Sequence, residues 1–256
     1  MAIPEPQASA LSSNAELEPD GADYGFVLHR RPYREHSSLL ELWTLHCGRV
    51  SVLTRSSAKK YTAQRATLQP FIPLELRLKK GAHGLWYLQE CKRRGPGFEL
   101  GVPVLFSAVY LNELIYYLVR TAEPDPELFA AYLNALNSLA AGQNESAILR
   151  RFEALLLASL GYALRYECAD GTPLQSSGLY RFIAQRGFEL IPTWRLEEDP
   201  TLSGYTGEML LSLKNGGNGD TAAQQVLKEL HRCVIDRLLG GRALKSRELY
   251  LQYQRL

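Results

Sequence analysis

Residues 38–55 read SLLELWTLHCGRVSVLTR and contain two runs rich in aliphatic and β-branched residues, separated by the short segment HCG. The runs 38–45 and 49–55 have the length and the composition that are typical of β-strands. Gly48 lies where a tight turn is needed, and glycine adopts turn conformations that other residues avoid. The stretch therefore predicts a β-hairpin, and we expect neighbouring strands to pair with it.

Three further segments of the same kind flank this hairpin. They are YGFVLH (24–29), LQPFIPLELRL (68–78) and HGLWYLQEC (83–91), with turn glycines between the last two. Pro70 and Pro73 suggest an edge or a bulge near the start of the fourth strand. Five short strands in about seventy residues are what a small closed barrel requires, so we predict a five-stranded OB-fold β-barrel over residues 23–95.

After Pro103 the hydrophobic pattern changes to the period of helices. The segment FSAVYLNELIYYLV (106–119) is apolar on nearly every side, which indicates a buried helix. Further helices are expected after the helix-starting residues Pro124, Pro126, Asn144 and Asp220 and after Leu244.

The sequence as a whole is therefore of the α+β class, with two predicted domains. An all-α helical domain over residues 96–256, with an irregular segment at 165–200, follows the barrel. Residues 1–22 are rich in Ala, Pro, Ser and Glu and predict a flexible acidic tail, because they offer little apolar area to bury.

Positive charge is concentrated in the barrel segment. Residues 24–94 hold fourteen Lys or Arg and four acids, a net charge of +10, whereas residues 1–23 carry −5 and residues 95–256 carry −3. Such an excess within one compact unit is typical of a surface that binds a polyanion, most often nucleic acid. The alternative is a basic surface that is merely well solvated.

The basic residues lie mainly in the expected turns of the barrel, with two tyrosines among them. Guanidinium and ammonium groups pair with phosphates, and aromatic rings offer faces on which unpaired bases stack. For Tyr33 and Tyr61 the alternative is packing against the rim of the barrel. The predicted DNA-binding residues are Arg30, Arg31, Tyr33, Arg34, Arg55, Lys59, Lys60, Tyr61, Arg65, Lys79, Lys80, Lys92, Arg93 and Arg94.

The sequence contains no recognisable catalytic or metal-binding pattern. The five histidines are scattered, and the four cysteines are widely spaced without a CxxC pair, so neither a zinc site nor a disulfide framework is indicated. The segment GGRALKSR (240–247) lacks the glycine that a P-loop places directly before Lys245. We therefore expect no enzymatic activity, no metal and no cofactor.

The helical part offers one candidate peptide-binding site at Arg150, Arg151 and Phe152. A cation beside an apolar groove suits a short acidic and hydrophobic peptide, because a carboxylate gains a bidentate partner while its neighbouring side chain gains a pocket. The alternative is a surface arginine on a core helix.

Several of these segments, in the same order, resemble the bacterial RecO family from about residue 24 onward. The matching runs are FVLHRRPYREHSSLLELWT, GRV at 48–50, LQPFIPLELR, YLNELIYYLV, LRRFEALLLASLGYAL and LGGRALKSRELYLQY. Some family members have a four-cysteine zinc site in the segment that corresponds to 165–200. Here only Cys168 is present, so zinc is not expected.

The resemblance implies a recombination mediator that acts in DNA repair. Such a protein binds single- and double-stranded DNA and anneals complementary strands. With RecR, and in many bacteria RecF, it helps to load RecA onto DNA coated with single-strand-binding protein (SSB). The resemblance also places Arg150 and its neighbours in the region that receives the acidic, hydrophobic C-terminal tail of SSB.

Two other functions remain open from the residues alone. The first is a non-catalytic adaptor whose basic barrel binds an acidic protein partner. The second is a nuclease, which is disfavoured because acids in the basic segment are few and dispersed. The sequence shows no membrane-spanning run and no signal peptide, so we expect a cytoplasmic, nucleoid-associated protein.

Overall fold

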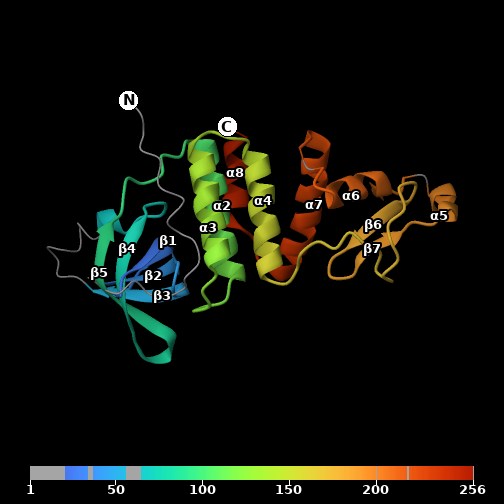
Figure 1. Ribbon diagram of the computed structural model, residues 1–256. Coiled ribbons are helices and arrows are strands. Elements are labelled where there is room, and N and C mark those ends of the chain that lie inside the picture. Colours follow the sequence, from blue (N-terminus) through green and yellow to red (C-terminus); the bar gives the residue numbers. More distant parts are fainter. Residues whose placement is uncertain (1–20, 34–36, 56–64, 200, 218, 256) are drawn as a thin grey trace. The chain divides into compact units, whose positions relative to one another are not determined.

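The computed structural model of the chain describes residues 21–33, 37–55, 65–199, 201–217 and 219–255 (Figure 1). The chain forms two compact units. The first comprises Met1–Gly101, as far as described, with Leu111–Ala140, and the second comprises Val102–Tyr110 with Ala141–Leu256. The helix α2 (Val102–Leu118) contributes to both units.

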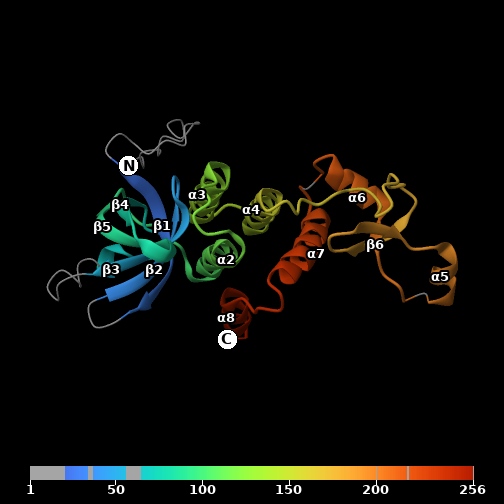
Figure 2. The same ribbon diagram turned by 90° about the horizontal axis from the view of Figure 1, so that it is seen from below.

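The first unit contains a closed five-stranded barrel with the strand order β1-β2-β3-β5-β4 (Figure 2). Its strands are β1 (Asp23–Pro32), β2 (Ser37–Thr44), β3 (Gly48–Arg55), β4 (Leu74–Lys80) and β5 (Leu85–Arg93), with a 3-10 turn η2 (Ala82–Gly84) before β5. Only β3 and β5 pair in parallel, and this pairing closes the barrel together with β1 and β4. The predicted five-stranded barrel is confirmed.

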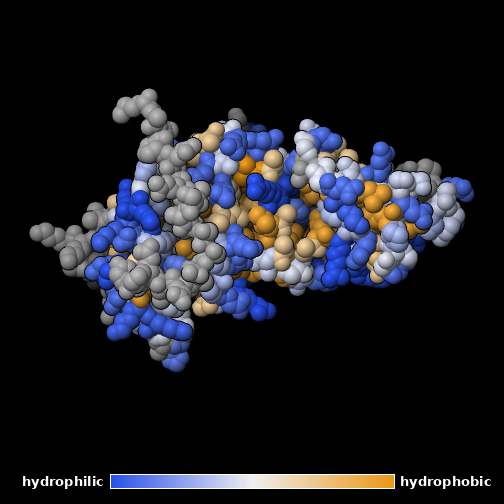
Figure 3. All heavy atoms as spheres, in the orientation of Figure 1, coloured by the Kyte–Doolittle hydropathy of each residue, from blue (hydrophilic) through white to orange (hydrophobic). Residues whose placement is uncertain are grey.

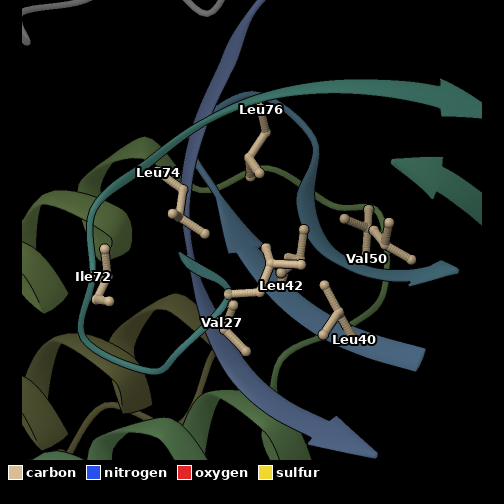
Figure 4. Packing of buried hydrophobic residues seen from close by; sticks show 9 residues of the cluster. Val27, Leu40, Leu42, Val50, Ile72, Leu74 and Leu76 are labelled. Carbon is tan, nitrogen blue, oxygen red and sulfur yellow. The ribbon is translucent and has the colours of Figure 1, made fainter. Parts of the chain in front are cut away.

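Alternate residues of the strands fill the interior of the barrel. Val27, Leu40, Leu42, Val50 and Leu76 are each fully buried, and Figure 4 shows their side chains pointing toward one another. Each such side chain stabilises the fold by about 1.5–3 kcal/mol relative to exposure to water. Because side chains alternate along a strand, the residues between these lie on the outer face.

The fourth strand begins later than predicted, at Leu74 instead of near Leu68. Phe71 has a positive φ of 63°, and Pro70 and Pro73 cannot donate a ladder hydrogen bond, so a turn at Pro70 and Phe71 precedes the strand. The register of the β4–β5 pair shifts between Arg77 and Leu78, where Gln89 of β5 is the extra residue, and not at the prolines.

Part of the outer face of the barrel is covered by the second half of α2 and by α3 (Pro126–Ala140), which lies beside the barrel in Figures 1 and 2. The Phe26 ring lies 5.4 Å from Tyr132 and 6.1 Å from Phe129 between ring centroids. The Tyr132 hydroxyl donates to Asn112 at 2.6 Å, and the Asn112 amide donates to the Leu28 carbonyl at 3.3 Å. Aromatic packing and buried hydrogen bonds thus hold the two helices on the barrel.

The second unit consists of helices and a small three-stranded sheet of order β7-β6-β8. Its remaining elements are α4 (Glu145–Ser159), β6 (Leu179–Ile183), β7 (Gly187–Leu190), α5 (Thr193–Glu198), β8 (Tyr205–Thr206), α6 (Gly207–Lys214), α7 (Thr221–Leu238) and α8 (Lys245–Tyr253). Asn144 accepts from the Ala147 N–H at 3.1 Å and Asp220 from the Ala223 N–H at 2.6 Å. The predicted starts of these two helices are therefore confirmed.

Residues 165–200 differ from the irregular segment that the sequence predicted. They contain β6, β7 and α5. Tyr180 of β6 and Phe188 of β7 are buried in a small hydrophobic core. The sheet was not predicted because its strands are short and because β8 pairs with β6 across more than twenty residues of the sequence.

Candidate nucleic-acid interface

The structure describes the side chains of nine of the fourteen predicted DNA-binding residues. Arg34, Lys59, Lys60 and Tyr61 lie outside the described residues, and Arg55 is described only as the last residue of β3. In Figure 3 the described surface of the barrel is mainly hydrophilic on the face shown. The nine side chains are Arg30, Arg31, Tyr33, Arg65, Lys79, Lys80, Lys92, Arg93 and Arg94.

Two arginines from separate strands, Arg30 and Arg93, reach one helical turn, residues 65–67, which itself carries the exposed Arg65. We call Arg30, Arg65 and Arg93 the arginine cluster. The Arg30 Nη1 donates to the Arg65 carbonyl at 3.3 Å, and the Arg93 Nη2 donates to the Ala66 carbonyl at 2.7 Å. These acceptors are neutral, so they orient the guanidinium groups without cancelling their charge. Neither Arg65 nor Arg93 has an acidic side chain within 4 Å in the described part of the chain.

Other predicted residues lie next to this cluster along the strands. Arg94 follows β5, and its guanidinium lies over the Tyr24 ring at 3.7 Å from the centroid. Lys92 is exposed and stands opposite Glu75 of β4. Tyr33 follows β1, its backbone N–H donates to the Ser37 carbonyl at 2.9 Å, and 42% of the residue is exposed. The β1–β2 connection thus carries an accessible aromatic ring.

Lys79 and Lys80 lie at the opposite end of the β4–β5 hairpin. Lys80 stands opposite Trp86, whereas Arg93 stands opposite Leu74, and six residues of β4 separate the two ends by roughly 20 Å. The Lys80 ammonium lies 5.9 Å from the centroid of the Trp86 ring. The described cations thus form two groups, and their joint action in one DNA site stays a prediction.

Comparison with known families identifies the chain. A family model described as "Recombination protein O N terminal" matches residues 22–95, and one described as "Recombination protein O C terminal" matches residues 104–248. The chain belongs to the RecO family. The resemblance inferred from the sequence is therefore confirmed, and the first match spans the barrel.

Curated RecO relatives are similar over most of their length. The protein named "DNA repair protein RecO" of Methylococcus capsulatus is 38% identical over 230 residues, which cover 89% of this chain and 92% of that protein. Those of Haemophilus influenzae (37%; 89% and 94% covered) and Vibrio vulnificus (35%; 91% and 94% covered) carry the same name.

In this RecO chain, Arg150 belongs to a buried polar cluster of the second unit. Its Nε and Nη2 donate to the two carboxylate oxygens of Glu153 at 2.7 and 2.5 Å. The Tyr110 hydroxyl donates to Glu153 at 2.8 Å, and the His231 Nδ1 lies 3.0 Å from its other oxygen. We call Tyr110, Arg150, Glu153 and His231 the Glu153 cluster.

Electrostatics within the Glu153 cluster favour the ionised carboxylate. Burial by itself would raise the pKa of Glu153, but hydrogen bonds from His231 and Arg150 and the charge of Arg150 outweigh it and hold the pKa below its ordinary value. Glu153 and Arg150 are only 2% and 7% exposed. The pair is therefore a structural ion pair that joins α4 to α2 and α7.

This placement bears on the predicted peptide site. Phe152 is 1% exposed and belongs to the core. The Nε and Nη2 atoms of Arg150 already donate hydrogen bonds to Glu153. Arg151 is exposed, and Leu155, one helical turn further on, is 43% exposed. Of the three predicted residues, Arg151 is thus the one whose side chain is open to solvent.

Tyr87, which is 42% exposed on β5, was not among the residues predicted from the sequence. Its signal is its position between Trp86 and Leu88, which pack toward the core, because neighbouring residues of a strand point to opposite faces. Within the described ranges, no three His, Cys, Asp or Glu side chains gather as metal ligands. No described helix is both long and apolar enough to cross a bilayer.

Proposed function

We propose that this RecO-family protein binds single- and double-stranded DNA on its barrel and anneals complementary strands. The arginine cluster carries the proposal, because the side chains of Arg30 on β1 and Arg93 on β5 both reach the 65–67 turn, which itself carries Arg65. Guanidinium groups pair with the phosphates of a nucleic-acid backbone, and the Ala66 carbonyl that Arg93 contacts is neutral. Annealing forms no covalent bond, so the protein needs no catalytic residues and no cofactor.

The proposed cellular role is that of a recombination mediator in DNA repair. Acting with RecR, and in some organisms RecF, the protein would bring DNA strands together and help RecA to replace SSB. The names of the relatives and the family match support a role in repair. The corresponding location is the cytoplasm, at the nucleoid.

Binding and annealing of fluorescent oligonucleotides test this proposal. If about six phosphates are neutralised, single-strand affinity should fall several hundred-fold between 50 and 200 mM salt, and complementary strands should anneal faster with the protein than without it. The assay is run with and without magnesium. Cleavage in magnesium would indicate a nuclease instead, and an absence of binding would favour an adaptor for an acidic protein.

We also propose that α4 receives the C-terminal tail of SSB near Arg150. Arg151 and Leu155 stand one turn apart on the same side of α4 and are both exposed. A carboxylate of the tail would pair with Arg151, and an apolar side chain would contact Leu155. In this arrangement Arg150 positions α4 through Glu153, and Phe152 supports it from the core.

The change Arg151→Ala should weaken binding of an SSB tail peptide about ten-fold, because a charge-assisted hydrogen bond is lost. Isothermal titration measures the affinity, and binding of bare single-stranded DNA should stay unchanged. The matched control is Arg232→Ala, which removes an arginine that is 61% exposed on α7. Equal peptide affinity in Arg151→Ala and the control would remove Arg151 from the site.

A further inference from the structure

We infer that Tyr87, on the outer face of the barrel beside Lys79, is a residue on which single-stranded DNA stacks an unpaired base. The inference rests on the proposed DNA binding. It adds which face of the barrel is used and which side chain lets the protein distinguish unpaired bases from a duplex.

The registers of all five strands place these residues in one row. Arg31 pairs with Leu39, Leu39 with Leu53, Leu53 with Tyr87, and Tyr87 with Lys79. Paired residues on neighbouring strands point to the same face of a sheet. Because the row crosses every strand of a closed barrel, it runs around the barrel, and Lys79 on β4 is the charged neighbour of Tyr87.

The row lies on the outside of the barrel. The neighbouring row contains Leu40 and Val52, which point into the core. Because successive side chains of a strand point to opposite faces, Leu39, Leu53 and Tyr87 point outward. Leu53 is buried and Leu39 half-buried, whereas Tyr87 is 42% exposed. Tyr87 is thus the member of the row that presents an aromatic ring to a ligand.

The hairpin before β5 fixes the position of the Tyr87 ring. Gly81 packs so closely on it that a Cβ added at Gly81 would lie 2.4 Å from the Tyr87 Cε2. The Gly81 N–H donates to the Leu85 carbonyl at 2.8 Å, which closes the turn beside the ring. A ring held in one orientation loses little entropy when a base stacks on it.

Lys79 is the cation next to Tyr87 in this row, and Arg31 stands three strands away from Tyr87. Arg31 and Lys79 are exposed, and within the described ranges neither forms an ion pair. On the same outer face Arg77 and Glu90 lie 3.6 Å apart and offset each other. The charge available to a phosphate beside Tyr87 is therefore that of Lys79, while the next row of β4 and β5, Arg77 and Glu90, offers no net charge.

An unpaired base can stack on Tyr87, whereas the bases of a duplex are already stacked on one another. The change Tyr87→Ala should therefore lower the affinity for an oligo-dT strand roughly five- to hundred-fold, with little effect on a duplex of the same length. Tyr87→Phe should retain the affinity, because the stacking face remains. Fluorescence anisotropy at fixed salt measures the affinity of each of the two variants for the single strand and for the duplex.

An abasic strand of equal length isolates the stacking contact. The wild-type protein should bind oligo-dT more tightly than the abasic strand, and this preference should shrink in Tyr87→Ala but not in Tyr162→Ala, the control at an exposed tyrosine of the second unit. Circular dichroism verifies that each variant is folded.

The possible outcomes distinguish a failure of the proposed DNA binding from a failure of the stacking role of Tyr87. If the wild-type protein binds no DNA, the proposed function fails. If it binds and Tyr87→Ala keeps the full preference for oligo-dT, only the assignment of Tyr87 is overturned. A loss of affinity in Tyr87→Ala that is equal for single strands, duplex and abasic strand would also overturn it, since stacking requires an unpaired base.

Discussion

Replacing Arg150 with alanine is expected to lower the free energy of unfolding by about 3–5 kcal/mol, because removal of one partner leaves the buried carboxylate of Glu153 without its main counter-charge. Arg150 and Glu153 are 7% and 2% exposed and share two hydrogen bonds. The Tyr110 hydroxyl and the His231 ring remain near the carboxylate but bring no second guanidinium. Chemical denaturation followed by circular dichroism measures the change.

The neighbouring change Arg151→Ala is the matched control for stability. Arg151 is exposed on the same helix, and such substitutions usually alter stability by less than about 0.5 kcal/mol. If Arg150→Ala unfolds at the same denaturant concentration as Arg151→Ala, the Glu153 cluster does not stabilise the second unit. A loss of SSB-tail binding in Arg150→Ala would then need another explanation than a displaced α4.

The same cluster predicts the pH dependence of stability. The pKa of Glu153 in the folded protein is held below the ordinary value of 4.5, so the unfolded chain takes up the proton more readily. The stabilisation from this group is therefore complete above pH 4.5 and is lost as the pH falls through the lower folded pKa. In Arg150→Ala this acid-sensitive contribution should be reduced.

The double change Arg65→Ala and Arg93→Ala should have the largest effect on DNA binding. If each arginine neutralises one phosphate of a single strand, loss of both lowers the affinity roughly twenty-five-fold at 0.1 M salt. The barrel itself should stay folded, because both side chains are exposed and lie outside the hydrophobic core. Fluorescence anisotropy with a single-stranded oligonucleotide measures the affinity.

A control variant of equal charge makes this result specific. Arg120→Ala with Arg186→Ala also removes two arginines, both of them exposed and in surface ion pairs outside the barrel. Its DNA affinity should remain close to that of the wild-type protein. Equal losses in the two double variants would mean that only the overall charge of the protein matters.

The barrel could be predicted because its segments are short and rich in apolar residues, and because some of them alternate, as in residues 49–55, where Val50 and Val52 turn inward. The start of β4 could not, because LQPFIP is as apolar as a strand, and the positive φ of Phe71 arises from the surrounding fold. The small sheet at residues 165–200 depends on pairing of β6 with β8, which no local pattern reveals.

The sequence predicted which segment of the chain carries the basic residues of the candidate site, but not how these residues are arranged in space. Charge counts located the basic segment, but the meeting of Arg30 and Arg93 at residues 65–67 depends on contacts between residues 27 to 35 positions apart. Arg150 and Glu153 stand three positions apart, yet the Glu153 carboxylate also contacts His231, 78 positions away, which no local pattern reveals. The row that contains Tyr87 depends on the registers of all five strands.

The salt dependence of single-strand binding tests most directly whether the arginine cluster contacts phosphates. The plot of log affinity against log salt concentration should be shallower by about 1.4 in the Arg65→Ala, Arg93→Ala variant than in the wild-type protein, because two phosphate contacts are missing. An unchanged slope, with the wild-type protein binding DNA normally, would contradict the assignment of single-stranded DNA to this end of the barrel.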